Sequence, residues 1–367
     1  MNKAARIISI GLIAAMSFMS GCAGIGPDTI ARDRFDYTFA ISDSWKSQML
    51  LNIVKMRYGN APIFLDVASV INQYSVEQEF GAGVGSEIYN RGEPSFIGPG
   101  VRAGGRYTDR PTITYSPIIG EKFAKSLMTP LPLYAVLNLV QSGYPIDMVF
   151  RFAVHSINGI QNRFGGLAIV HSADPEFYHL LEKLKNIQST KAIGMQIKKL
   201  KDKEASVIIL KGMVSPKTQE ESQEVRKILG LEPQETEFEV VYNLVSRSDK
   251  EIAIITRSML EILMDLGSLI EVPESHVATK RVNPTFKDEG VGRASVPPLM
   301  RVYSSPEKPA DVFVSVRYRD HWFFIDDRDL PSKGVFSFLM FAFTLTETGR
   351  SREGAPIVTI PTNHGCT

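Results

Sequence analysis

The chain has 367 residues, of which 44% are hydrophobic and 22% are charged, a balance typical of a globular protein that buries a core. Its 41 lysine and arginine residues against 40 aspartate and glutamate residues give a net charge of +1. Such a chain lacks the strong positive field that nucleic-acid binding uses, so its composition argues against nucleic acid as a partner.

The first residues have the layout of an export signal. Lys3 and Arg6 are followed by an apolar stretch, residues 7–18, which is too short for a comfortable bilayer span. The sequence Met19-Ser20-Gly21-Cys22 then resembles the lipobox of bacterial lipoproteins, although Met19 replaces the usual leucine. The alternative is a plain secretory signal, or an uncleaved anchor, with a chance cysteine.

The resemblance implies that residues 1–21 are removed and that Cys22 is acylated, with palmitate-like chains as the anchor. Several acyl chains hold a protein at a bilayer, whereas one chain does so only marginally. Ala23 follows the cysteine in place of the aspartate that retains lipoproteins in the inner membrane. We therefore expect an outer-membrane, lipid-anchored protein on the periplasmic face, with the membrane as its first partner.

The second cysteine, Cys366, has no partner once Cys22 carries lipid. This excludes an intramolecular disulfide and a cysteine-based zinc site. The six histidines are scattered without a metal-binding motif. We therefore expect no metal and no cofactor.

After a lipidated tether, residues 22–40, the spacing of Trp45, Met49, Ile53 and Met56 predicts a helix capped by the serine or aspartate at 42–43. Residues 61–80 are rich in β-branched and aromatic residues and predict one long strand or two shorter ones. Residues 81–105 hold eight glycines and predict an extended loop or a flap.

A hairpin turning at Thr108 to Pro111 is predicted next, followed by short helices over residues 120–160 and an amphipathic helix from Pro175. Residues 193–212 predict two strands joined by a charged turn, residues 220–230 a helix and residues 235–246 a strand.

Residues 248–273 predict one long helix, because Ile252, Ile255, Met259 and Leu263 recur at helical spacing. A polar linker follows over residues 275–298. A hairpin around Arg319-Asp320, an apolar helix after Lys333 and a last strand, residues 355–360, complete the pattern.

Strands and helices mix without a regular alternation, so the predicted fold class is α+β, with antiparallel hairpins. We expect an N-terminal α+β region with a Gly-rich loop, residues 41–190, and a C-terminal α+β region, residues 191–367.

Two groups of residues are candidates for chemistry. Asp326, Asp327 and Asp329 follow an aromatic strand and would be the carboxylates of a catalytic or metal site. The competing interpretation is a strand-to-helix junction in which Asp329 caps the helix that contains Pro331, and this interpretation is favoured.

The second group is a set of arginines and tyrosines that suits carboxylate, phosphate or sugar ligands: Arg102, Arg106, Tyr107, Arg110 and Tyr115. The competing interpretation is an exposed hairpin whose arginines only solvate one face.

Two segments, residues 35–75 and 316–347, resemble a group of uncharacterised proteobacterial outer-membrane lipoproteins, and the similarity runs over most of the mature chain. The resemblance implies an envelope location and a shared fold, and it brings no catalytic residues. The predicted function is a non-enzymatic structural or binding role with an envelope protein or component as partner. The alternatives are a periplasmic carboxylate-dependent hydrolase or transferase, and an accessory subunit of an envelope transport or secretion machine.

Overall fold

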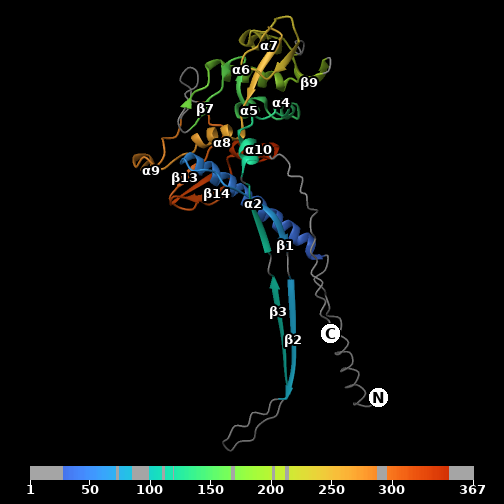
Figure 1. Ribbon diagram of the computed structural model, residues 1–367, viewed down its shortest axis with the longest axis vertical. Helices are drawn as coiled ribbons and strands as arrows, with labels where there is room; N and C mark the ends of the chain where they lie inside the picture. Colours follow the sequence, from blue (N-terminus) through green and yellow to red (C-terminus); the bar gives the residue numbers. More distant parts are fainter. Residues whose placement is uncertain are drawn as a thin grey trace, which may run out of the picture. The chain divides into compact units, whose positions relative to one another are not determined.

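A computed structural model describes residues 28–71, 74–84, 99–109, 112–118, 120–166, 170–200, 203–210, 215–286 and 296–346 (Figure 1). These residues divide into two compact units. The first holds the described part of Met1–Ser42 together with Leu65–Ser116, and the second holds Asp43–Phe64 with Pro117–Glu353. This division differs from the two consecutive regions, 41–190 and 191–367, expected from the sequence.

The first helix, α2 (Asp28–Arg57), is 30 residues long. It begins well before the predicted cap, so the prediction of a start at Ser42 or Asp43 is wrong, and residues 28–40 are helical. The reason is that no glycine or proline interrupts the chain from Asp28 to Arg57. The predicted buried stripe is confirmed, because Met49 and Ile53 are fully buried.

A long antiparallel ribbon follows, built from two chain segments. The outgoing segment holds β1 (Phe64–Ile71) and β2 (Tyr74–Val84), and the returning segment holds β3 (Pro99–Asp109) and β4 (Thr112–Ile118). β2 pairs with β3, and β1 pairs with β4. The two predicted strands over residues 61–80 are confirmed.

The predicted hairpin between residues 105 and 117 is wrong, because β3 pairs with β2 and not with β4. The predicted loop over residues 81–105 is also wrong for its described parts, 81–84 and 99–105, which are strands. Glycine weakens a strand but does not forbid one, and a partner strand of matched length stabilises it.

The second unit contains a six-stranded sheet of order β6-β5-β12-β11-β10-β9, in which only β11 and β12 run parallel among its described pairs. Its strands are β5 (Val154–Ile157), β6 (Ile160–Gln161), β9 (Ile193–Leu200), β10 (Lys203–Leu210), β11 (Glu237–Val241) and β12 (Glu251–Thr256). A separate short pair consists of β7 (Phe164–Gly165) and β8 (Val170–His171).

Helices α3 (Glu121–Met128), α4 (Leu133–Gln141), α5 (Ile146–Ala153), α6 (Pro175–Ser189) and α7 (Pro216–Leu229) belong to this unit. The predicted start of a helix at Pro175 is confirmed by α6. Pro132 and Pro145 directly precede α4 and α5. Apolar residues of α5, α6 and α7 meet the sheet in the core: Phe150, Leu184, Val225, Ile208 and Ile254.

The predicted long helix over residues 248–273 is wrong. The segment is strand β12 followed by α8 (Met259–Ser268). Ser258 is the N-cap of α8, and its hydroxyl accepts a hydrogen bond from Glu261 N at 3.2 Å. β12 lies between β11 and β5, so pairing on both edges outweighs the helical spacing of its isoleucines. The short helix α9 (Glu274–Ala278) then occupies part of the predicted polar linker.

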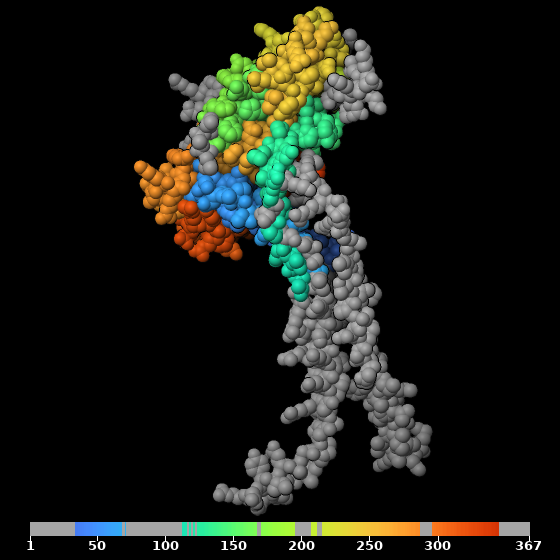
Figure 2. All heavy atoms as spheres, viewed as in Figure 1, coloured from blue at the N-terminus to red at the C-terminus, as the bar shows by residue number. Residues whose placement is uncertain are grey.

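The C-terminal part forms a three-stranded sheet of order β13-β15-β14, from β13 (Tyr303–Ser305), β14 (Val312–Tyr318) and β15 (His321–Asp326). The predicted hairpin is confirmed, and Arg319 and Asp320 have positive φ, as a tight turn requires. The helix α10 (Leu330–Thr346) packs on it through Phe336, whose ring lies 6.0 Å from that of Phe313. Figure 2 shows this C-terminal sheet beside α2, where Tyr58 contacts Phe323.

The architecture is α+β, as predicted. No helix within the described ranges is long and apolar enough to cross a membrane.

Candidate functional site

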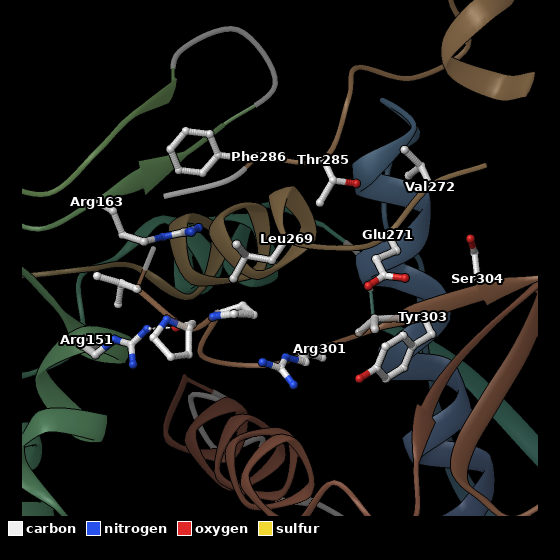
Figure 3. Close-up of a pocket in the computed structure, with 14 residues that line it drawn as sticks. Arg151, Arg163, Leu269, Glu271, Val272, Thr285, Phe286, Arg301, Tyr303 and Ser304 are labelled. Atoms are coloured by element: carbon white, nitrogen blue, oxygen red, sulfur yellow. Dashed lines mark hydrogen bonds between the residues drawn. The ribbon is translucent and has the colours of Figure 1, made fainter. Parts of the chain in front are cut away.

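A cavity of about 710 Å³ opens in the second unit, where segments from distant parts of the chain meet (Figure 3). Its size suits a small molecule. The lining combines arginines with aromatic, proline and hydroxyl groups: Arg151, Arg163, Leu269, Glu271, Val272, Thr285, Phe286, Val296, Pro297, Pro298, Arg301, Val302, Tyr303 and Ser304.

Hydrogen bonds fix the walls of this cavity. Arg151 of α5 donates from Nη2 to the Pro297 carbonyl at 2.7 Å. The backbone N–H of Glu271 donates to Val302 at 2.9 Å, and that of Arg301 donates to Ser332 Oγ at 2.9 Å. The segment that carries Arg301 is thus held from two sides, so its guanidinium is presented from a fixed backbone.

The lining residue Arg163 belongs to a buried ion-pair network. Asp265 of α8 accepts from Arg163 Nη2 at 2.6 Å and from Arg163 Nε at 3.2 Å. Its other carboxylate oxygen lies 3.3 Å from Arg257 Nη1, and the backbone N–H of Gly165 donates to Asp265 at 2.8 Å. Arg257 is 1% exposed, so Asp265 is shared by two guanidinium groups that are shielded from water. Glu261 Oε1 lies 3.9 Å from Arg257 Nε and is a second, weaker partner of that arginine.

The close approach of β7 to α8 depends on Gly165. A Cβ at this position would collide with the side chain of Ser268, which itself donates to the Asp265 carbonyl at 2.6 Å. Glycine is therefore required by space rather than by backbone conformation, and this contact sets Arg163 beside Asp265.

The three cavity arginines differ in their freedom to bind a ligand. Arg163 is committed to Asp265 and stacks over Phe286 at 5.3 Å. Arg301 is exposed, and Glu271 is the acidic residue among the described side chains that line the cavity. The cavity thus offers a guanidinium fork for a planar anion and a carboxylate for a hydrogen-bond donor.

A second cluster of titratable groups lies near the end of α2. The Tyr58 hydroxyl and His276 Nδ1 are 2.8 Å apart, and the rings of His276 and His321 are 4.8 Å apart. Burial raises the pKa of Tyr58 to about 12. Burial also lowers the pKa of His276. The neighbouring His321 and the positive charges of Arg281 and Arg319 lower it further. Tyr58 is therefore the donor to a neutral imidazole at neutral pH.

The predicted junction at the three aspartates is confirmed. The Asp329 carboxylate accepts from Ser332 N at 3.1 Å and from Ser332 Oγ at 2.7 Å, which is the geometry of an N-cap on α10. Asp327 pairs with Lys333 at 2.7 Å, and Asp326 accepts from the backbone N–H of Arg328 at 2.8 Å. The part of the chain that the structure describes holds no cluster of metal-ligating side chains, here or elsewhere.

The residues of the predicted arginine and tyrosine surface are divided between two strands of the ribbon, and their role as a binding surface stays a prediction. Arg102, Arg106 and Tyr107 belong to β3. Tyr115 belongs to β4 and is 55% exposed. Arg110 and the predicted lipidation site Cys22 lie outside the described residues.

Sequence reasoning did not find the cavity or its network. Arg163, Arg257 and Asp265 stand in no motif, and the only local indication is that Asp265 interrupts the apolar face of a helix. A buried aspartate between leucines requires a cationic partner, but its identity depends on the tertiary fold.

No protein-family model, no curated protein and no solved structure matches this chain.

Proposed function

We propose that the chain is an outer-membrane lipoprotein, acylated at Cys22 and facing the periplasm, that acts by binding rather than by catalysis. The observation that carries the binding role is the arginine-lined cavity of about 710 Å³. The three aspartates that a hydrolase could use are engaged in a helix cap and in contacts with Arg328 and Lys333 instead.

The cavity indicates the chemistry of the ligand. Arg301 suits a carboxylate or phosphate, because a guanidinium donates two parallel hydrogen bonds to such groups. Glu271 favours an amine or another donor at a second point of the same cavity. An envelope component or peptide with an anionic group and a free amine meets both requirements.

Binding can be tested with dialanine, which has a free amine and a free carboxylate, by saturation-transfer NMR on the lipid-free mature protein. We expect Arg301→Gln to weaken binding by roughly tenfold or more, since a hydrogen bond to a charged group contributes about 1.5–3 kcal/mol. Arg317→Gln is the matched control, because Arg317 is 63% exposed and does not line the cavity.

C-terminally amidated dialanine should bind more weakly than the free acid. Equal binding of both forms, or equal effects of the two arginine variants, would contradict the cavity as the anion site.

The anchor has a separate test. Cys22→Ser should abolish incorporation of radiolabelled palmitate and release the protein from the membrane fraction, since the thiol is the acceptor of the lipid. A Cys22→Ser protein that is still acylated and membrane-bound would refute the proposed anchor without affecting the cavity.

A further inference from the structure

Residues 271–286 leave the wall of the cavity and return to it as one loop, which we call the strap. Its first two and its last two residues line the cavity (Figure 3). The ends of the loop are tied together, because the Thr285 hydroxyl donates to the Ile270 carbonyl at 2.9 Å and the Phe286 N–H donates to the Ser268 carbonyl at 3.1 Å. Compact surface loops whose ends meet in this way are frequently functional.

The strap has few buried side chains. Among its residues, all of which the structure describes, His276 and Val282 are the two that are buried, at 5% and 8% exposure. Its short helix α9 is otherwise exposed or half-buried. A segment with so few buried contacts opens at a smaller cost than global unfolding, so the contacts of these two side chains decide whether the strap stays closed.

Two consecutive residues at the C-terminal end of α2 hold the strap. Arg57 is 6% exposed and donates from Nη2 to the carbonyls of Asn283 at 2.6 Å and Pro284 at 2.9 Å. The Tyr58 hydroxyl pairs with His276 Nδ1 at 2.8 Å. A guanidinium does not lose its proton in a protein, whereas an imidazole titrates near neutral pH. The contact of His276 is therefore the one that a change of pH can alter.

The surroundings of His276 oppose a positive charge on its ring. The ring lies 4.8 Å from that of His321 in β15, and Arg281 of the strap and Arg319 of the β14–β15 turn are nearby cations. Burial, His321 and these two arginines lower the pKa of His276, and Asp320 acts against them. The Asp320 side chain is 92% exposed, so water screens its charge. His276 therefore binds a proton more readily when the strap is open.

We propose that the strap is a pH-sensitive closure of the cavity, which stays closed while His276 is neutral and opens when His276 takes up a proton. The direction follows from linkage, because the open state binds the proton more tightly and is therefore favoured as the pH falls. An exposed histidine has a pKa of about 6.5, so the equilibrium constant for opening rises by at most about eightfold from pH 7.0 to pH 5.5.

Opening changes the cavity because the strap contains Glu271, the carboxylate that would contact the amine of a ligand. Arg301 lies on a different segment, whose backbone is held by Ser332 at 2.9 Å, and it keeps its place. The ligand is therefore held at two points at neutral pH and at one point in acid, where it is released. This consequence for the ligand rests on the proposed binding role, whereas the opening of the strap does not.

Hydrogen exchange of the full-length mature protein tests the opening. Mass spectrometry of peptides from residues 271–286, corrected for the intrinsic pH dependence of exchange, measures the opening at pH 7.0 and pH 5.5. We expect the protection of the strap to fall at least twofold, and by no more than about eightfold, while strand β12 keeps its protection. Equal protection of the strap at the two pH values would overturn the proposal.

Variants assign the effect to His276. His276→Asn should lose the pH dependence, because an amide oxygen can still accept from Tyr58 but does not titrate. Tyr58→Phe should exchange faster than the wild type at both pH values and keep the pH dependence, since burial and the arginines still act on the ring. His179→Asn is the matched control, because His179 is 45% exposed and pairs with Glu224 outside the strap.

The outcomes against the proposal are specific. A pH dependence that persists in His276→Asn, or that disappears in His179→Asn, would overturn the role of His276, provided that each variant keeps the far-UV circular dichroism of the wild type. If His276→Asn does not fold, Tyr58→Phe decides: exchange equal to that of the wild type at pH 7.0 would show that the hydrogen bond does not hold the strap.

Dialanine separates this inference from the proposed function. A ligand that binds the closed state must stabilise it, so an excess of dialanine should slow the exchange of the strap at pH 7.0. If saturation-transfer NMR shows that dialanine binds and the strap exchanges as before, the strap does not close on the ligand and the inference is wrong. If dialanine does not bind but the strap still opens in acid, the proposed ligand is wrong and the closure stands.

Discussion

Replacement of Asp265 by asparagine should be the most destabilising single change in the second unit. The carboxylate is 6% exposed and contacts Arg163 at 2.6 Å and Arg257 at 3.3 Å, and it also accepts from the Gly165 backbone at 2.8 Å. Asn keeps the shape but removes the charge, and it aims one N–H₂ group at an arginine. Arg163 then loses the carboxylate that compensates it, and Arg257 keeps only the more distant Glu261, whose Oε1 lies 3.9 Å from its Nε.

The expected loss of unfolding free energy is about 3–5 kcal/mol, the cost of leaving a buried charge without its partner. Urea denaturation followed by circular dichroism measures it, with the m-value as a check that the same surface is exposed. Asp327→Asn is the matched control. Asp327 also forms an ion pair, with Lys333, but its side chain is 55% exposed. Exposed pairs contribute about 0–1 kcal/mol.

A cost below about 1 kcal/mol for Asp265→Asn would refute this reasoning, since the buried pair would then behave like an exposed one. It would mean that water or another acidic group compensates Arg163 and Arg257.

Two further predictions concern single contacts. Asp329→Ala removes the cap that accepts from Ser332 at 3.1 Å, and it should cost about 1 kcal/mol in the same denaturation assay, more than Asp327→Ala. His276 has a lowered pKa in the folded state, so the unfolded state binds more protons and the stability should fall as pH drops below about 6.5. His276→Asn should flatten this slope between neutral and acidic pH. Tyr58→Phe leaves the imidazole in place and should keep the slope.

Each of these has a contradicting outcome. If Asp329→Ala and Asp327→Ala lower the free energy of unfolding equally, the cap contributes no more to stability than an exposed ion pair does. An unchanged pH slope in His276→Asn would assign the acid sensitivity to other groups.

Local signals predicted the elements whose causes are local. The turn at Arg319-Asp320, the helix from Pro175 and the cap at Asp329 each depend on residues within a few positions of one another. For these elements, backbone sterics and side-chain capping act over one or two turns, so a single sequence contains the cause.

The errors occur where a distant strand decides the outcome. Ile252 and Ile255 fit a helical stripe with Met259, and the same residues fit a strand. β12 is a strand because β5 and β11 pair with its two edges. β5 lies about a hundred positions earlier in the chain, so the spacing of residues within residues 248–273 does not contain this cause. The cavity was not predicted either, because its walls come from segments that are far apart in the sequence and meet only in the folded chain.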